Sequence, residues 1–132
     1  MDKIKINQKE GCLAVEEIKR AIWVKVKFEA VHNWPECPIE EVKFLRVPHR
    51  HMFEVVVKVS VNHSDRQVEF IHFNHLVTDY LRQTFERKNI GRMSCEDIAE
   101  AIFKHLVTVY GITPLLISVS EDGENGAEIW QT

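Results

Sequence analysis

The chain alternates hydrophobic and polar side chains in two long stretches, residues 22–30 and residues 49–61. Successive side chains of a β-strand point to opposite faces of a sheet, so each stretch predicts a long strand with one buried face. Continuing the parity of the first stretch places His32 on its buried face. His49 and His51 share the buried face of the second strand. Three histidines are therefore expected on the core side of neighbouring strands.

The segment between these strands, residues 33–48, contains Pro35, Pro38 and Pro48. Proline interrupts the hydrogen bonding of strands and helices, so this segment is predicted to be a long loop. Loops of this length in a small domain are usually functional. After the second strand, a polar turn at residues 62–65 is followed by a predicted short strand at residues 67–70.

Two amphipathic helices are predicted next. Hydrophobic residues at spacings of three and four between residues 73 and 85 form one helical stripe, and this helix is expected to end near Gly91. Ser94 followed three positions later by Asp97 has the pattern of an N-cap that begins a second helix. Gly111 marks its expected end.

The chain ends with alternating residues at 115–119, a glycine-containing turn and a short stretch at residues 127–130, which predict two more strands. The order ββααββ favours an antiparallel sheet with both helices on one face, an α+β fold in two layers. We assign this domain to residues 21–132. Residues 1–20 show no clear period and are expected to form an N-terminal arm or an extra element.

Composition adds little to this picture. The 132 residues are 45% hydrophobic and 28% charged, as in soluble single domains, and the net charge is -3. This charge gives no general attraction to nucleic acid or to an anionic membrane, and neither partner is expected.

No stretch approaches the roughly 20 apolar residues of a membrane span, and the N-terminus lacks the apolar core of a signal peptide, so we expect a cytoplasmic protein. Three cysteines without a CxxC pair indicate neither a disulfide framework nor a thiolate zinc site.

The histidines carry the first chemical signal. His49 and His51 are two positions apart on one strand, so their side chains lie roughly 7 Å apart at the backbone on one face. If the first two strands pair as a hairpin, His32 joins them with a fourth coordination position open, the pattern of a catalytic zinc site. The alternative is that the histidines are structural and are satisfied by hydrogen bonds within the strands. At this point both interpretations stay open.

Five short motifs occur in order along the chain: FEAxH at residues 28–32, PHRHMF at 48–53, VEF at 68–70, SCEDIA at 94–99 and VSED at 119–122. In series they resemble the motifs of the 6-pyruvoyltetrahydropterin synthase family, which includes the 6-carboxytetrahydropterin synthases of queuosine biosynthesis. The resemblance extends over about residues 22 to 130. It therefore covers nearly the whole predicted domain.

The resemblance implies a tunnelling fold (T-fold), in which ββααββ subunits assemble into a homo-oligomeric, hexamer-type ring. By position it implies that His32, His49 and His51 are the ligands of a Zn²⁺ cofactor. Glu121 matches the acidic residue that holds the guanidine-like edge of a pterin ring, for which a carboxylate is well suited. The implied ligand is a small pterin-like or deazapurine-like molecule. The alternative for Glu121 is an ordinary exposed acid of a turn.

This sequence also departs from the family. Leu45 stands where the family has its catalytic cysteine, and Cys37 lies in the same loop but twelve residues before His49. The Leu-Asp-His segment that completes the family's proton relay has no counterpart between residues 81 and 94, so we assign no catalytic residue. Arg50 replaces a glycine and is expected to lie beside the metal. Three further histidines are most simply exposed helix residues: His72, His75 and His105.

We therefore expect a divergent member of the family that keeps the zinc site and Glu121 and binds a pterin or deazapurine-type ring without the usual reaction. One alternative is an active zinc-dependent lyase that acts on dihydroneopterin triphosphate through a rearranged base. A second alternative is a non-catalytic T-fold scaffold. Fold alone does not decide among these functions.

Overall fold

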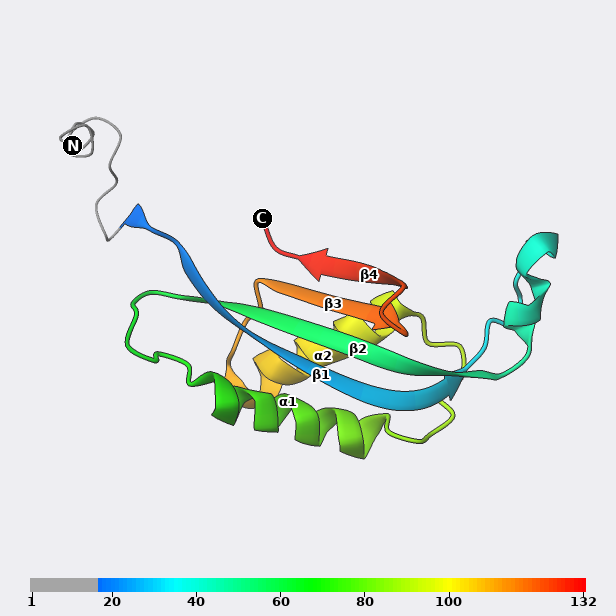
Figure 1. The fold of residues 1–132 in the computed structure, drawn as a ribbon, viewed down its shortest axis with the longest axis horizontal. Helices are drawn as coiled ribbons and strands as arrows, with labels where there is room; N and C mark the ends of the chain where they lie inside the picture. The colour runs from blue at the N-terminus through cyan, green and yellow to red at the C-terminus, as the bar shows by residue number, and fades with distance from the viewer. Residues whose placement is uncertain (1–16) are drawn as a thin grey trace, which may run out of the picture.

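The two alternating stretches form the longest strands of the protein. A computed structural model describes residues 17–132 and shows β1 (Arg20–His32) and β2 (His49–Val61) paired antiparallel along their whole length (Figure 1). Their register sets Arg20 opposite Val61 and His32 opposite His49. The ends of both strands that carry histidine therefore lie together.

Two shorter strands complete the sheet. β3 (Leu116–Glu121) pairs with β2, and β4 (Asn125–Trp130) pairs with β3, so the sheet has the order β1-β2-β3-β4 and is antiparallel throughout. In this register Phe53 lies opposite Glu121, which lies opposite Asn125. Glu121 thus ends β3 on the same face of the sheet as the histidines.

Both helices, α1 (Phe70–Thr84) and α2 (Cys95–Tyr110), cover one face of the sheet (Figure 1). The core lies between the two layers and contains Phe28 and Phe53 from the sheet with Phe73 and Ile98 from the helices. The predicted α+β fold in two layers is confirmed. Among residues 17–132, no helix combines the length and apolar character needed to cross a membrane.

Two sequence predictions around α1 are wrong. Residues 67–69 form no strand, because the Glu69 carboxylate accepts hydrogen bonds from the backbone N–H groups of Ile71 and His72 and starts the helix at Phe70. The helix also ends at Thr84 rather than near Gly91. The following segment leaves the helix to bond with β1, where the Ile90 N–H donates to the Val31 carbonyl.

The loop of residues 33–48 carries a short 3₁₀ helix, η3 (Glu40–Arg46). The two ends of the loop are held together because the Trp34 N–H donates to the Leu45 carbonyl. In Figure 1 this segment projects beyond the end of the sheet that carries the histidines. Residues 1–16 of the predicted N-terminal arm, Cys12 among them, lie outside the described residues, so that element stays a prediction.

Candidate metal centre and adjoining cavity

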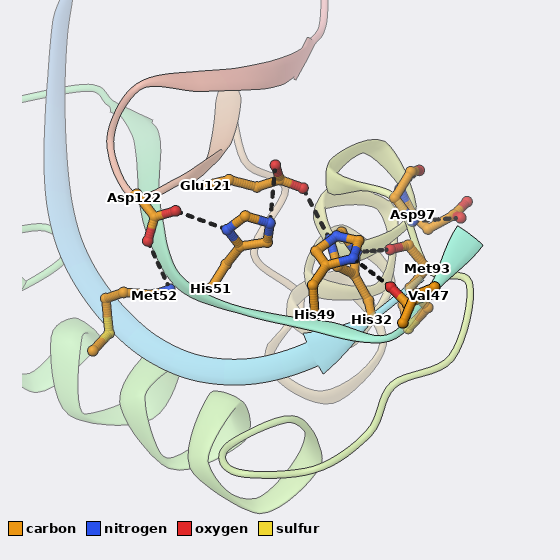
Figure 2. Close-up of polar contacts among 10 residues, drawn as sticks. His32, Val47, His49, His51, Met52, Met93, Asp97, Glu121 and Asp122 are labelled. Atoms are coloured by element: carbon orange, nitrogen blue, oxygen red, sulfur yellow. Dashed lines mark hydrogen bonds and ion pairs between the residues drawn. The ribbon is translucent and has the colours of Figure 1, made fainter. Parts of the chain in front are cut away.

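Three histidines converge at one end of the sheet, on the face covered by the helices. His32 is the last residue of β1, His49 is the first of β2, and His51 follows two positions later on the same face. One ligand nitrogen from each lies within 4.8 Å of the others. The structure therefore brings together the three histidines that strand parity placed on the core side (Figure 2).

The Nδ1 atom of each imidazole is engaged by an oxygen. His32 Nδ1 lies 2.8 Å from the Met93 carbonyl, His49 Nδ1 lies 2.8 Å from the Val47 carbonyl, and His51 Nδ1 lies 2.7 Å from an Asp122 carboxylate oxygen. A carbonyl only accepts hydrogen bonds, so the proton of a neutral His32 or His49 is on Nδ1. Nε2 then carries the free lone pair, which is the arrangement of metal-ligating histidines.

The Nε2 atoms of His32 and His49 are buried and have no hydrogen-bond partner. A buried polar atom left in this state costs on the order of 1–3 kcal/mol. His32 Nε2 lies 3.0 Å from the Glu121 carboxylate, at ion-pair distance but without the alignment of a hydrogen bond. A cation bound between these nitrogens would satisfy them, and the residues present fit a metal ion.

The charges around the cluster also favour a cation. Burial lowers the pKa of His32, but the Glu121 carboxylate and the Met93 carbonyl raise it by more, so the net pKa is raised. The neighbouring His32, followed by the charges of His51 and His49, lowers the pKa of Glu121 and keeps it ionised. A proton or a metal ion at Nε2 of His32 is thus held by an adjacent negative charge.

A cavity of about 510 Å³ opens beside the cluster, within the size range of small-molecule sites. His32, His49 and Glu121 form part of its wall, together with residues 94–97 at the start of α2 and residues 125–127 of β4. Arg92 also lines it and pairs with Glu36, with 3.2 Å between the guanidinium and the carboxylate. The cluster therefore faces a space where a ligand can approach it.

Leu45 lines this cavity, as the comparison with the family motif predicts for its position. Cys37 does not line it: its thiol is buried within the loop, near the carbonyl oxygens of Ile39 and Val42. The expectation that Arg50 lies beside the metal is wrong. Adjacent residues of a strand face opposite sides of the sheet, and the Arg50 guanidinium pairs with Glu29 on the face away from the histidines.

Cys95 is a cavity residue that the sequence did not single out. Burial, reinforced by the negative charges of Glu121 and Glu96, raises the pKa of its thiol to about 12. A thiol of this kind is a poor base at neutral pH. The remaining four histidines stay apart from the cluster: His63 is exposed in the turn after β2, His72 and His75 are exposed on α1, and His105 stacks on Tyr80 with ring centroids 4.0 Å apart.

The sequence also does not predict which residues contact the Nδ1 atoms of the three histidines. Met93 and Val47 contribute backbone carbonyls, which no residue type signals. Asp122 does carry a chemical signal, because it is an acid next to Glu121, but its pairing with His51 depends on the conformation of the turn after β3.

No protein-family model matches this sequence, and no curated protein sequence matches it. Solved structures share its fold. One is the uncharacterized protein WS1659 from Wolinella succinogenes, with a TM-score of 0.73 and 11% identity over 87% of this chain and 99% of that chain. Another is 6-pyruvoyl tetrahydropterin synthase from Caenorhabditis elegans, with a TM-score of 0.63 and 14% identity over 90% of this chain and 100% of that chain. The predicted T-fold is confirmed for the single subunit.

Proposed function

We propose that this protein binds Zn²⁺ through Nε2 of His32, His49 and His51 and binds a pterin or deazapurine-type ring in the adjoining cavity. The observation that carries the proposal is that each of the three histidines offers a ring nitrogen within 4.8 Å of the others, while its Nδ1 atom is engaged by an oxygen. Three nitrogen ligands with one position left open are typical of zinc sites that act on a ligand. The bound metal would supply Lewis-acid polarisation of an oxygen on that ligand.

Glu121 supports the ring-binding part of the proposal. Its carboxylate is ionised and lines the cavity, so it can accept two hydrogen bonds from the amino and ring N–H groups of a guanidine-like edge. The fold likeness to a 6-pyruvoyl tetrahydropterin synthase agrees with such a ligand. Within this proposal the zinc-binding histidines and Glu121 orient the ring between the sheet and the start of α2.

The chemistry of the cavity favours binding or altered chemistry over the usual elimination of triphosphate. Leu45 has no ionisable group, and burial keeps the Cys95 thiol protonated. Among the described residues that line the cavity, Arg92 is the one arginine or lysine, and Glu36 already pairs with it. The site therefore has little positive charge to offer a triphosphate. An active lyase with a rearranged base is the second candidate, favoured by the histidine cluster itself.

The proposal extends to assembly in the cytoplasm as a homo-oligomeric ring. In the described part of the chain, β4 and most of β1 pair with no further strand at their outer edges, while the end of β1 near His32 bonds to residues 87–91. Unpaired edges are available for strand pairing between copies. This arrangement supports the ring.

The metal content of untagged protein tests the proposal. We expect about one zinc per chain in the parent and loss of this zinc in His49→Ala, because two imidazoles rarely retain zinc. His75→Ala removes an exposed histidine outside the cluster and should keep the metal. A parent that stays free of metal after zinc is offered would overturn the proposal and make the histidines structural.

Ligand assays on the zinc-loaded protein decide between the candidate functions. Binding of neopterin without turnover of dihydroneopterin triphosphate is the expected result. Turnover of that triphosphate would establish the lyase instead. A zinc-loaded protein that binds no pterin or deazapurine would contradict the ring-binding part and leave only the metal site.

A further inference from the structure

His51 differs from the other two histidines in what holds its Nδ1 atom. His32 and His49 contact neutral backbone carbonyls, whereas His51 contacts the carboxylate of Asp122 at 2.7 Å (Figure 2). A carboxylate bound to the outer nitrogen fixes the tautomer and ring orientation of a ligating histidine and increases its basicity. Asp122 therefore has the position and the chemistry of an outer-sphere partner.

Asp122 is itself held by two hydrogen bonds to one residue of β2. Its backbone N–H donates to the Met52 carbonyl at 2.7 Å, and its second carboxylate oxygen accepts from the Met52 N–H at 3.1 Å. These bonds continue the contact between β2 and β3 one residue past the pair of Phe53 and Glu121. The carboxylate is thereby fixed even though the Asp122 side chain is 46% exposed.

The backbone at Asp122 is in the left-handed region, with φ 57°. Aspartate and asparagine tolerate this conformation better than most other residues that have a side chain. The conformation directs the chain into the turn before β4 while the carboxylate remains beside His51 and Met52. A short polar residue at this position satisfies both the turn and the histidine.

We propose that Asp122 is a positioning residue of the metal site, which holds His51 with Nε2 directed at the metal and strengthens it as a ligand. This inference rests on the proposed zinc site. It adds a carboxylate–histidine–metal relay through His51 Nδ1, the ring nitrogen remote from Nε2, which itself lies 3.4 Å from a Glu121 carboxylate oxygen. The metal affinity of the protein then depends on a residue that touches neither metal nor ligand.

Asp122→Asn is the sharpest test, because asparagine keeps the left-handed backbone and removes one acceptor. The Met52 N–H and His51 Nδ1 contact different oxygens of the carboxylate, so in the variant one of the two would face the amide NH2 group, which donates and does not accept. We expect the zinc dissociation constant, measured by chelator competition, to rise about ten- to a hundredfold. The visible spectrum of the Co²⁺-loaded protein, which reports metal coordination, should change as well.

Glu124→Gln is the matched control, because it removes the same charge from an exposed residue of the same turn. It should leave the zinc affinity and the Co²⁺ spectrum at parent values.

The outcomes separate this inference from the function on which it rests. A parent that binds no zinc overturns both. A parent that binds zinc with an affinity that Asp122→Asn leaves unchanged overturns the role of Asp122 and keeps the zinc site. Equal losses in Asp122→Asn and Glu124→Gln would show a general effect of charge or folding and also overturn it.

Discussion

Each imidazole of the cluster has two ring nitrogens, and the structure gives them different surroundings. Nδ1 contacts an oxygen in all three cases, while the Nε2 atoms of His32 and His49 are buried without a hydrogen-bond partner and His51 Nε2 lies 3.4 Å from a Glu121 carboxylate oxygen. Histidines that only stabilise a strand end have no reason to leave two buried Nε2 atoms without a partner. This division of roles favours a metal site over the structural alternative.

Glu121→Gln tests the proposed ring-binding residue. We expect the affinity for neopterin to fall about tenfold or more, because charge-assisted hydrogen bonds contribute about 1.5–3 kcal/mol each. Titration of the zinc-loaded protein by calorimetry measures the affinity for neopterin. The zinc content, measured alongside, distinguishes weaker binding of the ring from loss of the metal. Glu96→Gln, which removes another acid of the cavity wall, should bind neopterin nearly as the parent does. Parent-like affinity in Glu121→Gln would make Glu121 an ordinary acid of a turn.

Cys95 gives a prediction about reactivity. With a pKa of about 12, its thiol should be alkylated by iodoacetamide at pH 8 more than about a thousandfold slower in the folded protein than in urea, because the thiolate is the reactive form. Peptide mass spectrometry after timed quenching follows this cysteine separately from Cys37. Fast alkylation of Cys95 in the native state would show an activated thiol in the cavity and would favour the lyase candidate.

At the residue scale, the sequence predicts only what strand parity and motif positions determine. Parity was sufficient for His32, His49 and His51, because each lies in or at the end of a regular strand. The same parity places Arg50 on the face of the sheet away from the metal, since Arg50 lies between two inward-facing histidines. Asp122 could not be predicted in its role, because its contact with His51 arises from the left-handed turn after β3.

At the scale of elements, the site depends on the register of three strands. His32 pairs with His49, and Phe53 pairs with Glu121, so the ends of β1, β2 and β3 meet with their inner faces aligned. A slip of one residue in β2 would move both of its histidines to the opposite face of the sheet. The buried valines of this strand oppose such a slip, because they would move into water with the histidines. The register that buries the valines of β2 in the core is therefore the same register that places its histidines in the site.

The N-terminus of α1 gives a prediction about pH. Hydrogen bonds from the backbone N–H groups of His72 and Ile71 lower the pKa of the Glu69 carboxyl. A lowered pKa in the folded state means that its stabilisation is complete above the unfolded pKa, about 4.5, and is lost as the pH falls through the folded value. The free energy of unfolding of the parent should therefore exceed that of Glu69→Gln at neutral pH. This difference should shrink below about pH 4.5.

Urea unfolding of both proteins at a series of pH values measures this difference. Glu100→Gln, on the exposed side of α2, is the control and should show no comparable change with pH. A difference between the parent and Glu69→Gln that stays constant down to pH 3 would contradict the capping role of the carboxylate.

The elements of regular period were predictable, and the errors lie where the period ends. The Ser94 and Asp97 pattern predicted the start of α2, and both capping hydrogen bonds are present. The sequence pattern assigns Glu69 to a strand, because an isolated acid before a hydrophobic run does not distinguish a cap from a strand end. The early end of α1 depends on hydrogen bonds between residues 87–90 and β1. These are tertiary contacts, and the spacing of hydrophobic residues within the helix does not predict them.

At the scale of the whole molecule, the sheet has one covered and one uncovered face. On the uncovered face, one row crosses all four strands: Trp23 lies opposite Lys58, Lys58 opposite Leu116, and Leu116 opposite Trp130. The two tryptophans belong to the edge strands β1 and β4 and are 60% and 63% exposed. Large aromatic side chains at both edges are the residues expected where one copy of the chain meets another.

This arrangement predicts that the protein is a homo-oligomer and that Trp130→Lys weakens it. A lysine on an edge strand opposes pairing with a second strand, and the substitution also removes an aromatic contact. Light scattering coupled to size-exclusion chromatography should give a multiple of 15.5 kDa for the parent and a shift toward 15.5 kDa for the variant. Val109→Lys, at an exposed position of α2 and not on an edge strand, should keep the parent mass. A parent that remains at 15.5 kDa at every concentration would show that the edges stay unpaired in solution, and the metal site would then function within a single chain.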